Sequence, residues 1–282
     1  MCYNQSMNVL KDHYQLLKFY SEIGVKEPIG LTPRSRISTE LKSQFTNEII
    51  PNEQSENNKP AALSQVQSRN KGHITIGENA TIAQSKEIAD NSNTLGELYS
   101  AINAFEGCNL KRTATNTVTG SGNKTATIMF VGEAPGAEED RQGLPFVGPA
   151  GQLLDRMFNS IGLNRTEVFI TNILPWRPPG NRTPTIEEIA LCQPFAERQI
   201  TLIQPKILVL IGGIAAKAIL KRKEGITRLR GKWQNISIVG LNTPILTLAT
   251  FHPAYLLRQP TAKKEAWADF LSIKKKLASL DF

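Results

Sequence analysis

The part of the sequence best suited to chemistry is a glycine-rich loop that carries several carboxylates. It follows the apolar run Ile128–Val131 and reads GEAPGAEEDRQGLPFVGPAG. Gly132 lets the backbone come close to a ligand, whereas the acids would repel a phosphate group. The loop also lacks the Gly-Lys-Ser/Thr ending of a Walker loop and the pattern of a dinucleotide fingerprint. We therefore expect it to meet a neutral base, a sugar or a water molecule, with a purely structural strand-to-helix turn as the alternative.

Two later loops contain single polar residues of a catalytic type. Asn172 ends the apolar run Val168–Asn172 and leads into the loop ILPWRPPGNRTP, and His252 lies in the loop FHPAYLLRQP. A carboxamide can read the edge of a base, and an imidazole can donate a hydrogen bond to a developing negative charge. Taken alone, however, each residue is more typical of a structural cap or turn.

Predicted strands and helices alternate along the chain and would position these loops. The expected strands are 128–131, 168–172, 207–211 and 245–249, and the expected helices lie at 95–105, 186–203, 215–220 and around 267–277. This alternation predicts an α/β fold, a three-layer α/β/α arrangement with a central four-stranded parallel sheet. The loops that follow such strands share one edge of the sheet, where ligands bind.

Changes in composition divide the chain into three parts. Residues 1–30 contain an amphipathic helix, expected over Met7–Ile23, which would dock on the core or bind a protein partner. Residues 31–93 are rich in Ser, Asn, Gln, Glu, Lys and Thr, and this composition predicts a disordered linker. Residues 94–282 are expected to form the catalytic domain, which we expect to be monomeric.

The overall composition favours an intracellular protein with a polyanionic partner. The 282 residues carry a formal net charge of +8 and 40% of them are hydrophobic. No apolar run is long enough to span a bilayer, and the N-terminus lacks a cleavable signal pattern, so we expect no membrane association. The cysteines, Cys2, Cys108 and Cys192, are odd in number and far apart, which is typical of a reducing cytoplasmic setting.

Several long motifs, in order, resemble those of the family-four uracil-DNA glycosylases within the uracil-DNA glycosylase superfamily. They are GEAPGAEEDRQGLPFVGPAGQLLDRM, TNILPWRPPGNRTPT, GITRLRGKW and HPAYLLRQP, and the resemblance covers roughly Phe105 to Leu277. It implies that the protein flips uracil out of single- or double-stranded DNA and hydrolyses its glycosidic bond, leaving an abasic site for base-excision repair. Association with the nucleoid would follow.

The resemblance also implies roles for individual residues around the base. Asn172 matches the asparagine that reads uracil, and Phe146 matches the aromatic residue on which the base stacks. His252 matches the histidine beside the 2-carbonyl, where a donor stabilises the departing uracilate. Gly132 and Ala134 belong to the base-binding loop, and Ala134 replaces the aspartate of the GQDPY motif found in family-one enzymes.

Two acids of the glycine-rich loop are candidates for positioning the attacking water. The resemblance favours Glu139, with Glu133 as the second catalytic acid. Either carboxylate would stabilise a positively charged sugar in an oxocarbenium-like transition state. The alternative for Glu139 is a wall that excludes the methyl group of thymine.

Further residues are expected to contact the DNA. By resemblance Leu256 is the wedge that fills the gap left by the flipped base, with Leu257 as a close second and core packing as the alternative for both. Arg258 would grip phosphate beside the wedge. The arginine-rich loop supplies the remaining DNA-binding candidates, Arg177, Asn181 and Arg182.

The chain departs from the family at its cysteines. The resemblance implies four cysteines that hold a [4Fe–4S] cluster, but only Cys108 and Cys192 are in place. Phe105 and Trp176 stand at the other two positions. We therefore expect no iron–sulfur cluster, no other cofactor and no catalytic metal.

The sequence thus predicts a uracil-DNA glycosylase. One alternative is a non-catalytic module that binds uracil or abasic sites in DNA during replication or repair. A mononucleotide-binding α/β protein is another, but the acidic loop and the absence of phosphate-binding motifs weigh against it.

Overall fold

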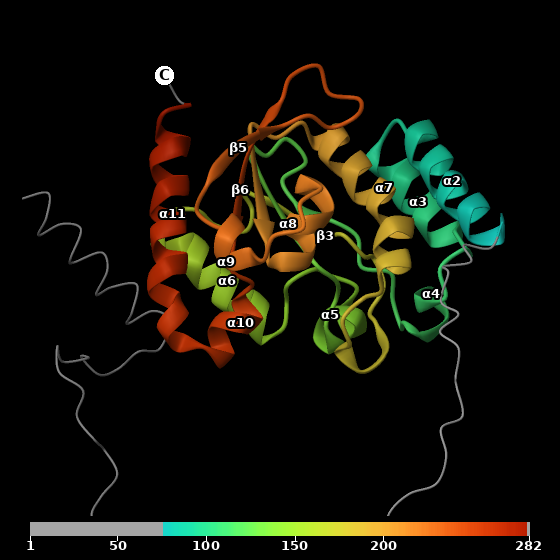
Figure 1. Ribbon diagram of the computed structural model, residues 1–282, viewed down its shortest axis with the longest axis horizontal. Helices are drawn as coiled ribbons and strands as arrows, with labels where there is room; N and C mark the ends of the chain where they lie inside the picture. Colours follow the sequence, from blue (N-terminus) through green and yellow to red (C-terminus); the bar gives the residue numbers. More distant parts are fainter. Residues whose placement is uncertain (1–75, 281–282) are drawn as a thin grey trace, which may run out of the picture. The chain divides into compact units, whose positions relative to one another are not determined.

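The computed structural model describes residues 76–280, in which a six-stranded sheet is covered by helices on both faces (Figure 1). The strands are β1 (Ser121–Gly122), β2 (Ile128–Gly132), β3 (Phe169–Asn172), β4 (Ile207–Ile211), β5 (Trp233–Ile236) and β6 (Ile245–Thr250). They are ordered β1-β3-β2-β4-β6-β5. Strands β3, β2, β4 and β6 run parallel, which confirms the predicted parallel centre, and β1 and β5 add antiparallel edges.

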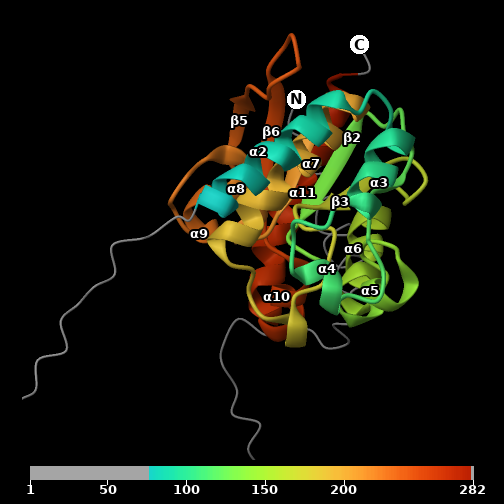
Figure 2. The same cartoon turned by 90° about the vertical axis from the view of Figure 1, so that its right-hand side faces the viewer.

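The helices connect the parallel strands and form the outer layers. They are α2 (Ile76–Asn91), α3 (Leu95–Ala104), α4 (Leu110–Thr113), α5 (Ala137–Gln142), α6 (Pro149–Ser160), α7 (Ile186–Ile203), α8 (Gly213–Leu220), α9 (Ile226–Leu229), α10 (Pro253–Arg258) and α11 (Lys263–Ala278). The short 3₁₀ turns η2 (Pro179–Asn181) and η3 (Pro260–Ala262) complete the list. Helices α6 and α11 lie on one side of the sheet, and α3 and α7 lie on the other, with α2 outermost (Figures 1 and 2).

Alternate residues of the central strand pack into the two layers. On one face the ring of Phe130 contacts Phe158 of α6 and Phe270 of α11, with centroid distances of 4.6 and 6.4 Å. On the other face Met129 and Val131 belong to one buried cluster with residues of α3, α7 and α8. All residues of β2 are buried, as expected for a parallel strand that is covered on both faces. This burial makes the sheet a rigid base for the loops at its edge.

Helix α2 contradicts the expected linker over residues 31–93. It packs against α7, and its Ser85 and Ala89 are 0% and 2% exposed. Arg198 of α7 donates a hydrogen bond from Nε to the carbonyl of Ser92, at 2.7 Å. The prediction failed because polar residues dominate this segment, although Ile82 and Ile88 pack against the core cluster. The folded domain therefore includes residues from 76 onward.

Other predictions on the N-terminal part fall outside the described residues. They are the amphipathic helix over Met7–Ile23 and the linker over residues 31–75. Within residues 76–280, no helix combines the length and the apolar character needed to cross a membrane.

Candidate active site

A cavity of about 420 Å³ opens where the loops that follow β2, β3 and β6 meet. Its walls include most of the predicted site residues, namely Glu133, Ala134, Glu139, Phe146, Asn172, Asn181, Arg182, His252 and Arg258. Gly132, Arg177, Leu256 and Leu257 do not line it. The three loops that the sequence singled out therefore share one site at the carboxyl edge of the parallel strands, as open α/β sheets require.

Asn172 lines this cavity and has an unpaired acceptor. Parallel pairing of β2 with β3 sets Asn172 opposite Gly132. The side chain is 4% exposed, and its Oδ1 has no hydrogen-bond partner among the described residues. A buried acceptor without a partner costs about 1–3 kcal/mol, so it calls for a ligand that donates to it.

Gly132 brings the backbone close to both base-binding side chains. A Cβ at this position would overlap the Oδ1 atom of Asn172 and the ring of Phe146. Only glycine therefore lets the asparagine and the aromatic ring lie against the end of β2. The predicted role of Gly132 in close approach is thus structural, since it makes room for side chains at the floor of the cavity.

Phe146 forms an aromatic wall in an unusual backbone conformation. Its φ angle is +55°, a left-handed value that is uncommon for residues other than glycine. The side chain is 4% exposed, and its ring stacks on the imidazole of His252 with a centroid distance of 5.6 Å and an interplanar angle of 30°. Both aromatic rings belong to residues that line the cavity.

His252 is held as a neutral imidazole in a defined tautomer. It is the N-cap of α10, and its Nδ1 accepts a hydrogen bond from the backbone N–H of Ala254 at 3.1 Å. Burial, and secondarily the positive charge of Arg258, lower the pKa of His252 to about 4. At neutral pH the proton is therefore on Nε2, which can donate to a ligand. Gly212 supports this placement, since a Cβ there would lie 3.1 Å from the Cβ of His252.

The carboxylate of Glu139 is occupied by the backbone. Its Oε1 accepts from the N–H groups of Val147 and Gly148, at 2.9 and 2.8 Å, and its Oε2 accepts from Gly136 at 3.1 Å. The acidic segment is a short helix, α5, rather than the expected loop, and Glu139 closes its N-terminal capping box. Glu139 therefore joins two turns of the site through three hydrogen bonds and also lines the cavity.

Glu133 is the second acid of the cavity and has a different environment. It directly follows β2, is half-buried and lines the cavity. Burial raises its pKa above the usual value for glutamate. The ionised form of a desolvated carboxylate is stabilised by a nearby positive charge or by a water molecule that donates a hydrogen bond to it.

Helix α10 corrects the prediction for the apolar wedge. Leu256 is 1% exposed and belongs to the core, whereas Leu257 is 46% exposed. The sequence could not show which of the two leucines is exposed, because adjacent helical residues point in different directions. Tyr255, which the sequence analysis did not single out, is 36% exposed and lines the cavity. Its spacing of three residues from Arg258 is the signal that places both on one helical face.

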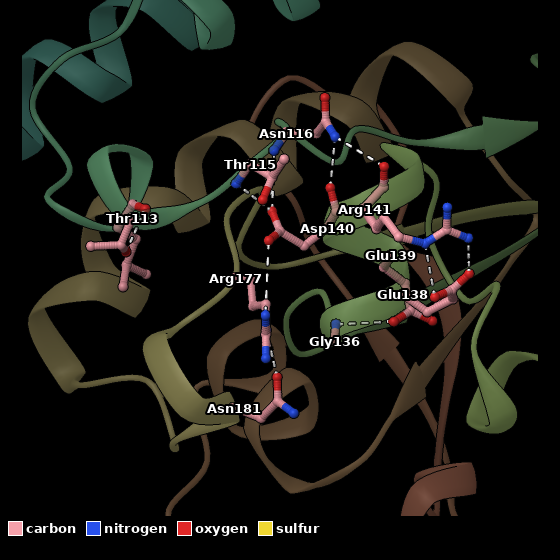
Figure 3. A network of polar contacts seen from close by, with 11 residues as sticks. Thr113, Thr115, Asn116, Gly136, Glu138, Glu139, Asp140, Arg141, Arg177 and Asn181 are labelled. Atoms are coloured by element: carbon pink, nitrogen blue, oxygen red, sulfur yellow. Dashed lines mark hydrogen bonds and ion pairs between the residues drawn. The ribbon is translucent and has the colours of Figure 1, made fainter.

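A polar network ties the acidic helix to the arginine-rich loop (Figure 3). Asp140 is 4% exposed and accepts from the backbone N–H groups of Thr115 and Asn116 at 2.8 and 3.1 Å. Its other oxygen lies 4.0 Å from the guanidinium of Arg177, which in turn donates to Oδ1 of Asn181 at 2.7 Å. Arg177 therefore holds the loop in place instead of facing the cavity.

The other arginines at the mouth of the cavity differ in their pairing. Arg182 donates to both carboxylate oxygens of Glu188, at 2.9 and 2.6 Å. Arg258 is exposed and has no ion-pair partner within residues 76–280. Arg258 is thus the guanidinium best placed to meet a phosphate at this mouth.

The residues at the implied iron–sulfur site do not fit such a cluster. Trp176 is fully buried, donates from Nε1 to Oγ1 of Thr117 at 3.1 Å and stacks with Phe105 at a centroid distance of 6.4 Å. A hydrogen bond to Cys108, together with burial, raises the pKa of Cys192 well above its usual value. Within the described part of the chain, no group of three or more His, Cys, Asp or Glu side chains could hold a metal ion. Aromatic rings occupy this part of the core.

Comparison with known proteins identifies relatives of this chain. Residues 119–271 match the model of the uracil DNA glycosylase superfamily. A type-4 uracil-DNA glycosylase from Archaeoglobus fulgidus is 41% identical over 184 residues, which cover 64% of this chain and 92% of the relative. A type-4 uracil-DNA glycosylase from Saccharolobus solfataricus is 44% identical, covering 61% of this chain and 81% of the relative. One from Thermotoga maritima is 45% identical, covering 54% and 77%.

Proposed function

The chain belongs to the uracil DNA glycosylase superfamily and excises uracil from DNA, and we propose that the cavity beside β2, β3 and β6 holds the flipped base. The observation that carries this proposal is the buried, unpartnered Oδ1 of Asn172. Asn172 and Phe146 both line the cavity. A planar ligand with an N–H group at its edge would satisfy both features.

Asn172 reads the base in this proposal. Its Oδ1 accepts from the imide N–H of uracil, and its amide group donates to the neighbouring 4-carbonyl. Cytosine presents the reverse pattern and would leave both groups of the carboxamide mismatched. In a buried site this mismatch discriminates strongly, because polar groups lose their hydrogen bonds with water without gaining others.

Phe146 and His252 bind and activate the same base. Uracil stacks on the ring of Phe146, and the Nε2–H of His252 donates to the 2-carbonyl. Cleavage of the glycosidic bond moves electrons into the base, so a neutral donor at that oxygen stabilises the uracilate as it leaves. The depressed pKa of His252 suits this role, since the imidazole acts as a hydrogen-bond donor without having to bind a second proton.

We assign to Glu133 the stabilisation of the positively charged sugar and the orientation of the attacking water. Both acids line the cavity, but the carboxylate of Glu139 already accepts from three backbone N–H groups. Negative charge near the sugar stabilises an oxocarbenium-like transition state, and a carboxylate can orient the attacking water. Glu139 contributes by holding the turn that carries Phe146. Ala134 contributes to the wall of the cavity beside Glu133.

Helix α10 carries the contacts to the duplex. We assign the wedge to Leu257, the exposed leucine of the helix; Tyr255, on another side of the helix, lines the cavity. An apolar side chain in the base stack fills the gap left by the flipped nucleotide. Arg258 and Arg182 would contact phosphates of the DNA backbone near the flipped nucleotide.

We further propose that the protein acts as a monomer on nucleoid DNA in the cytoplasm, in base-excision repair.

Excision can be tested directly with the purified full-length protein. We expect alkali-labile sites to appear in uracil-containing single- or double-stranded oligonucleotides, in the presence of EDTA, and none in matched thymine-containing ones. Replacement His252→Ala should slow single-turnover excision by roughly 30- to 1000-fold, the scale of losing one preorganised donor, while DNA binding is kept. If the wild-type protein binds uracil-containing DNA without ever cleaving the glycosidic bond, the alternative of a non-catalytic binding module replaces this proposal.

A further inference from the structure

The conformation of Phe146 requires support from its surroundings. A left-handed φ angle at a bulky residue persists only where neighbouring groups over-determine it. The turn 145–148 therefore needs contacts that hold both its carbonyl groups and its N–H groups. The structure supplies one charged side chain for each set.

Arg165, which precedes β3, holds the carbonyl groups. One of its terminal nitrogens donates to the carbonyl of Pro145 at 3.0 Å, and the other donates to the carbonyl of Phe146. Its Nε donates to the carboxylate of Asp155 on α6, also at 3.0 Å. The guanidinium thus bridges helix α6 and two consecutive carbonyls of the turn, an arrangement that needs the planar fork of arginine.

Glu139 holds the N–H groups of the same turn from α5. Its Oε1 accepts from Val147 and Gly148, the two residues that follow Phe146. Gly151 lies directly behind, and a Cβ there would overlap the carbonyl of Phe146. The backbone of the turn is therefore fixed by the guanidinium of Arg165, by the carboxylate of Glu139 and by close packing against Gly151.

We infer that Arg165 is a positioning residue for base recognition, because it holds the Phe146 turn in the conformation that sets the ring against the cavity. Arg165 does not line the cavity, so it acts through Phe146 alone. The inference rests on the proposed function, in which the flipped uracil stacks on Phe146. No motif in the sequence marks this arginine, since it stands in a loop at the opposite end of β3 from Asn172.

A double-mutant cycle tests whether Arg165 acts through Phe146. Single-turnover excision is measured for the wild type, Arg165→Ala, Phe146→Ala and the double variant. We expect Arg165→Ala to slow excision by roughly 10- to 100-fold, but by less than about threefold when Phe146 is already alanine, because coupled residues are not additive. The control Arg141→Ala removes an arginine that is exposed and paired with exposed Glu138, and it should match the wild type. Effects that multiply in the double variant would overturn the inference.

A second readout does not depend on catalysis. Amide hydrogen exchange at residues 146–148 should be faster in Arg165→Ala than in the wild type and unchanged in Arg141→Ala. If the wild type fails to excise uracil, the proposed function falls, and exchange still decides whether Arg165 holds the turn. If Arg165→Ala does not fold, Asp155→Ala replaces it, since this change removes the acceptor that orients the guanidinium. Wild-type exchange and excision in that variant would overturn the inference.

Discussion

Two side chains around the cavity are kept in states that lower the stability of the free protein. Phe146 has a left-handed backbone and Asn172 has an unpaired buried acceptor, and each feature costs on the order of 1–3 kcal/mol. A third side chain, His252, has a lowered pKa, which keeps its imidazole neutral and costs nothing at neutral pH. They gather in one cavity because each becomes favourable when a uracil edge, a stacked ring or a developing negative charge is present. The site is thus organised before the base enters it.

At Asn172, the pattern of donor and acceptor can be changed with little change of shape. We expect Asn172→Asp to reduce uracil excision sharply, by roughly 100-fold or more, because a carboxylate cannot donate to the 4-carbonyl. Single-turnover rates on uracil- and cytosine-containing duplexes check this, with thermal melting as a control for folding. A wild-type rate on uracil would remove Asn172 from base recognition.

Replacement of the two acids of the glycine-rich segment by glutamine should have different effects on catalysis and on stability. Glu133→Gln removes the negative charge beside the sugar, and we expect the chemical step to slow by roughly 100-fold or more with little loss of stability. Glu139→Gln leaves one of its acceptor positions to an amide that cannot accept, so the turn that carries Phe146 should loosen and the melting temperature should fall. Single-turnover kinetics and melting curves of both variants separate the two effects. A crippled chemical step in Glu139→Gln at wild-type stability would restore Glu139 as the acid that positions water.

At the level of elements, the sequence was sufficient wherever a long apolar run or a capping box was present. The four parallel strands were predicted, and so was helix α7, whose Thr185 and Glu188 form a capping box. Helix α2 was missed because polar residues dominate its sequence, although Ile82, Ile88 and Ala89 pack in the core. Strands β1 and β5 were missed because edge strands need not be apolar throughout, as the partly exposed β5 shows.

The sequence predicted which loops form the site, but it did not predict where each side chain in them points. Motifs placed Asn172, Phe146 and His252 in the cavity, because each follows a strand at the carboxyl edge of the sheet or lies in the loop behind it. The tasks of Glu139 and Leu256 depend on where short helices point their side chains, and sequence spacing did not show this. Arg165 acts from outside the cavity, through carbonyl groups that any sequence would provide.

Trp176 should be a major contributor to the core between α3, α4 and α7. It is fully buried, its ring stacks with Phe105, and its indole N–H is paired with Thr117. We expect Trp176→Ala to lower the free energy of unfolding by about 3–5 kcal/mol, the range for deleting a buried aromatic side chain. Urea denaturation measures this. The control Trp233→Ala alters a partly exposed tryptophan of an edge strand and should cost less.

The same part of the core predicts an iron-free protein. A [4Fe–4S] cluster takes four thiolates, whereas Cys108 and Cys192 are the two cysteines present there. We expect protein purified without oxygen to lack both iron and visible absorption. The double change Phe105→Cys and Trp176→Cys provides a positive control, because it supplies a set of four thiols for reconstitution with iron and sulfide. A brown wild-type protein with about four irons per chain would contradict the prediction.

At the scale of the whole molecule, charge and protonation decide how folding and DNA binding respond to solution conditions. The net charge of +8 favours a polyanion, and affinity for DNA should fall as salt rises because bound phosphates release counterions. Stability depends on pH through groups whose pKa differs between the folded and unfolded chain. Burial raises the pKa of Glu133 and of Asp269, and it lowers that of His252. The raised and the lowered pKa values change the unfolding free energy in opposite directions as pH falls. A comparison of the wild type with a variant that lacks one of these groups isolates the contribution of that group.

The contribution of His252 to global stability should therefore appear as a difference between the wild type and His252→Ala. Its pKa is about 4 in the folded protein and 6.5 in the unfolded chain. Above pH 6.5 the imidazole is neutral in both states, so the difference in unfolding free energy is constant. Between pH 6.5 and 4 mainly the unfolded chain binds the proton, and the wild type should lose up to about 3 kcal/mol relative to the variant as pH falls. Below pH 4 both states are protonated, and the difference levels off.

Urea denaturation of both proteins at several pH values measures this curve. The contributions of Glu133 and Asp269 cancel, because both residues are present in the wild type and in the variant. A difference that stays constant between pH 7 and 4 would mean that His252 titrates normally, and the neutral donor in the proposed mechanism would then be lost.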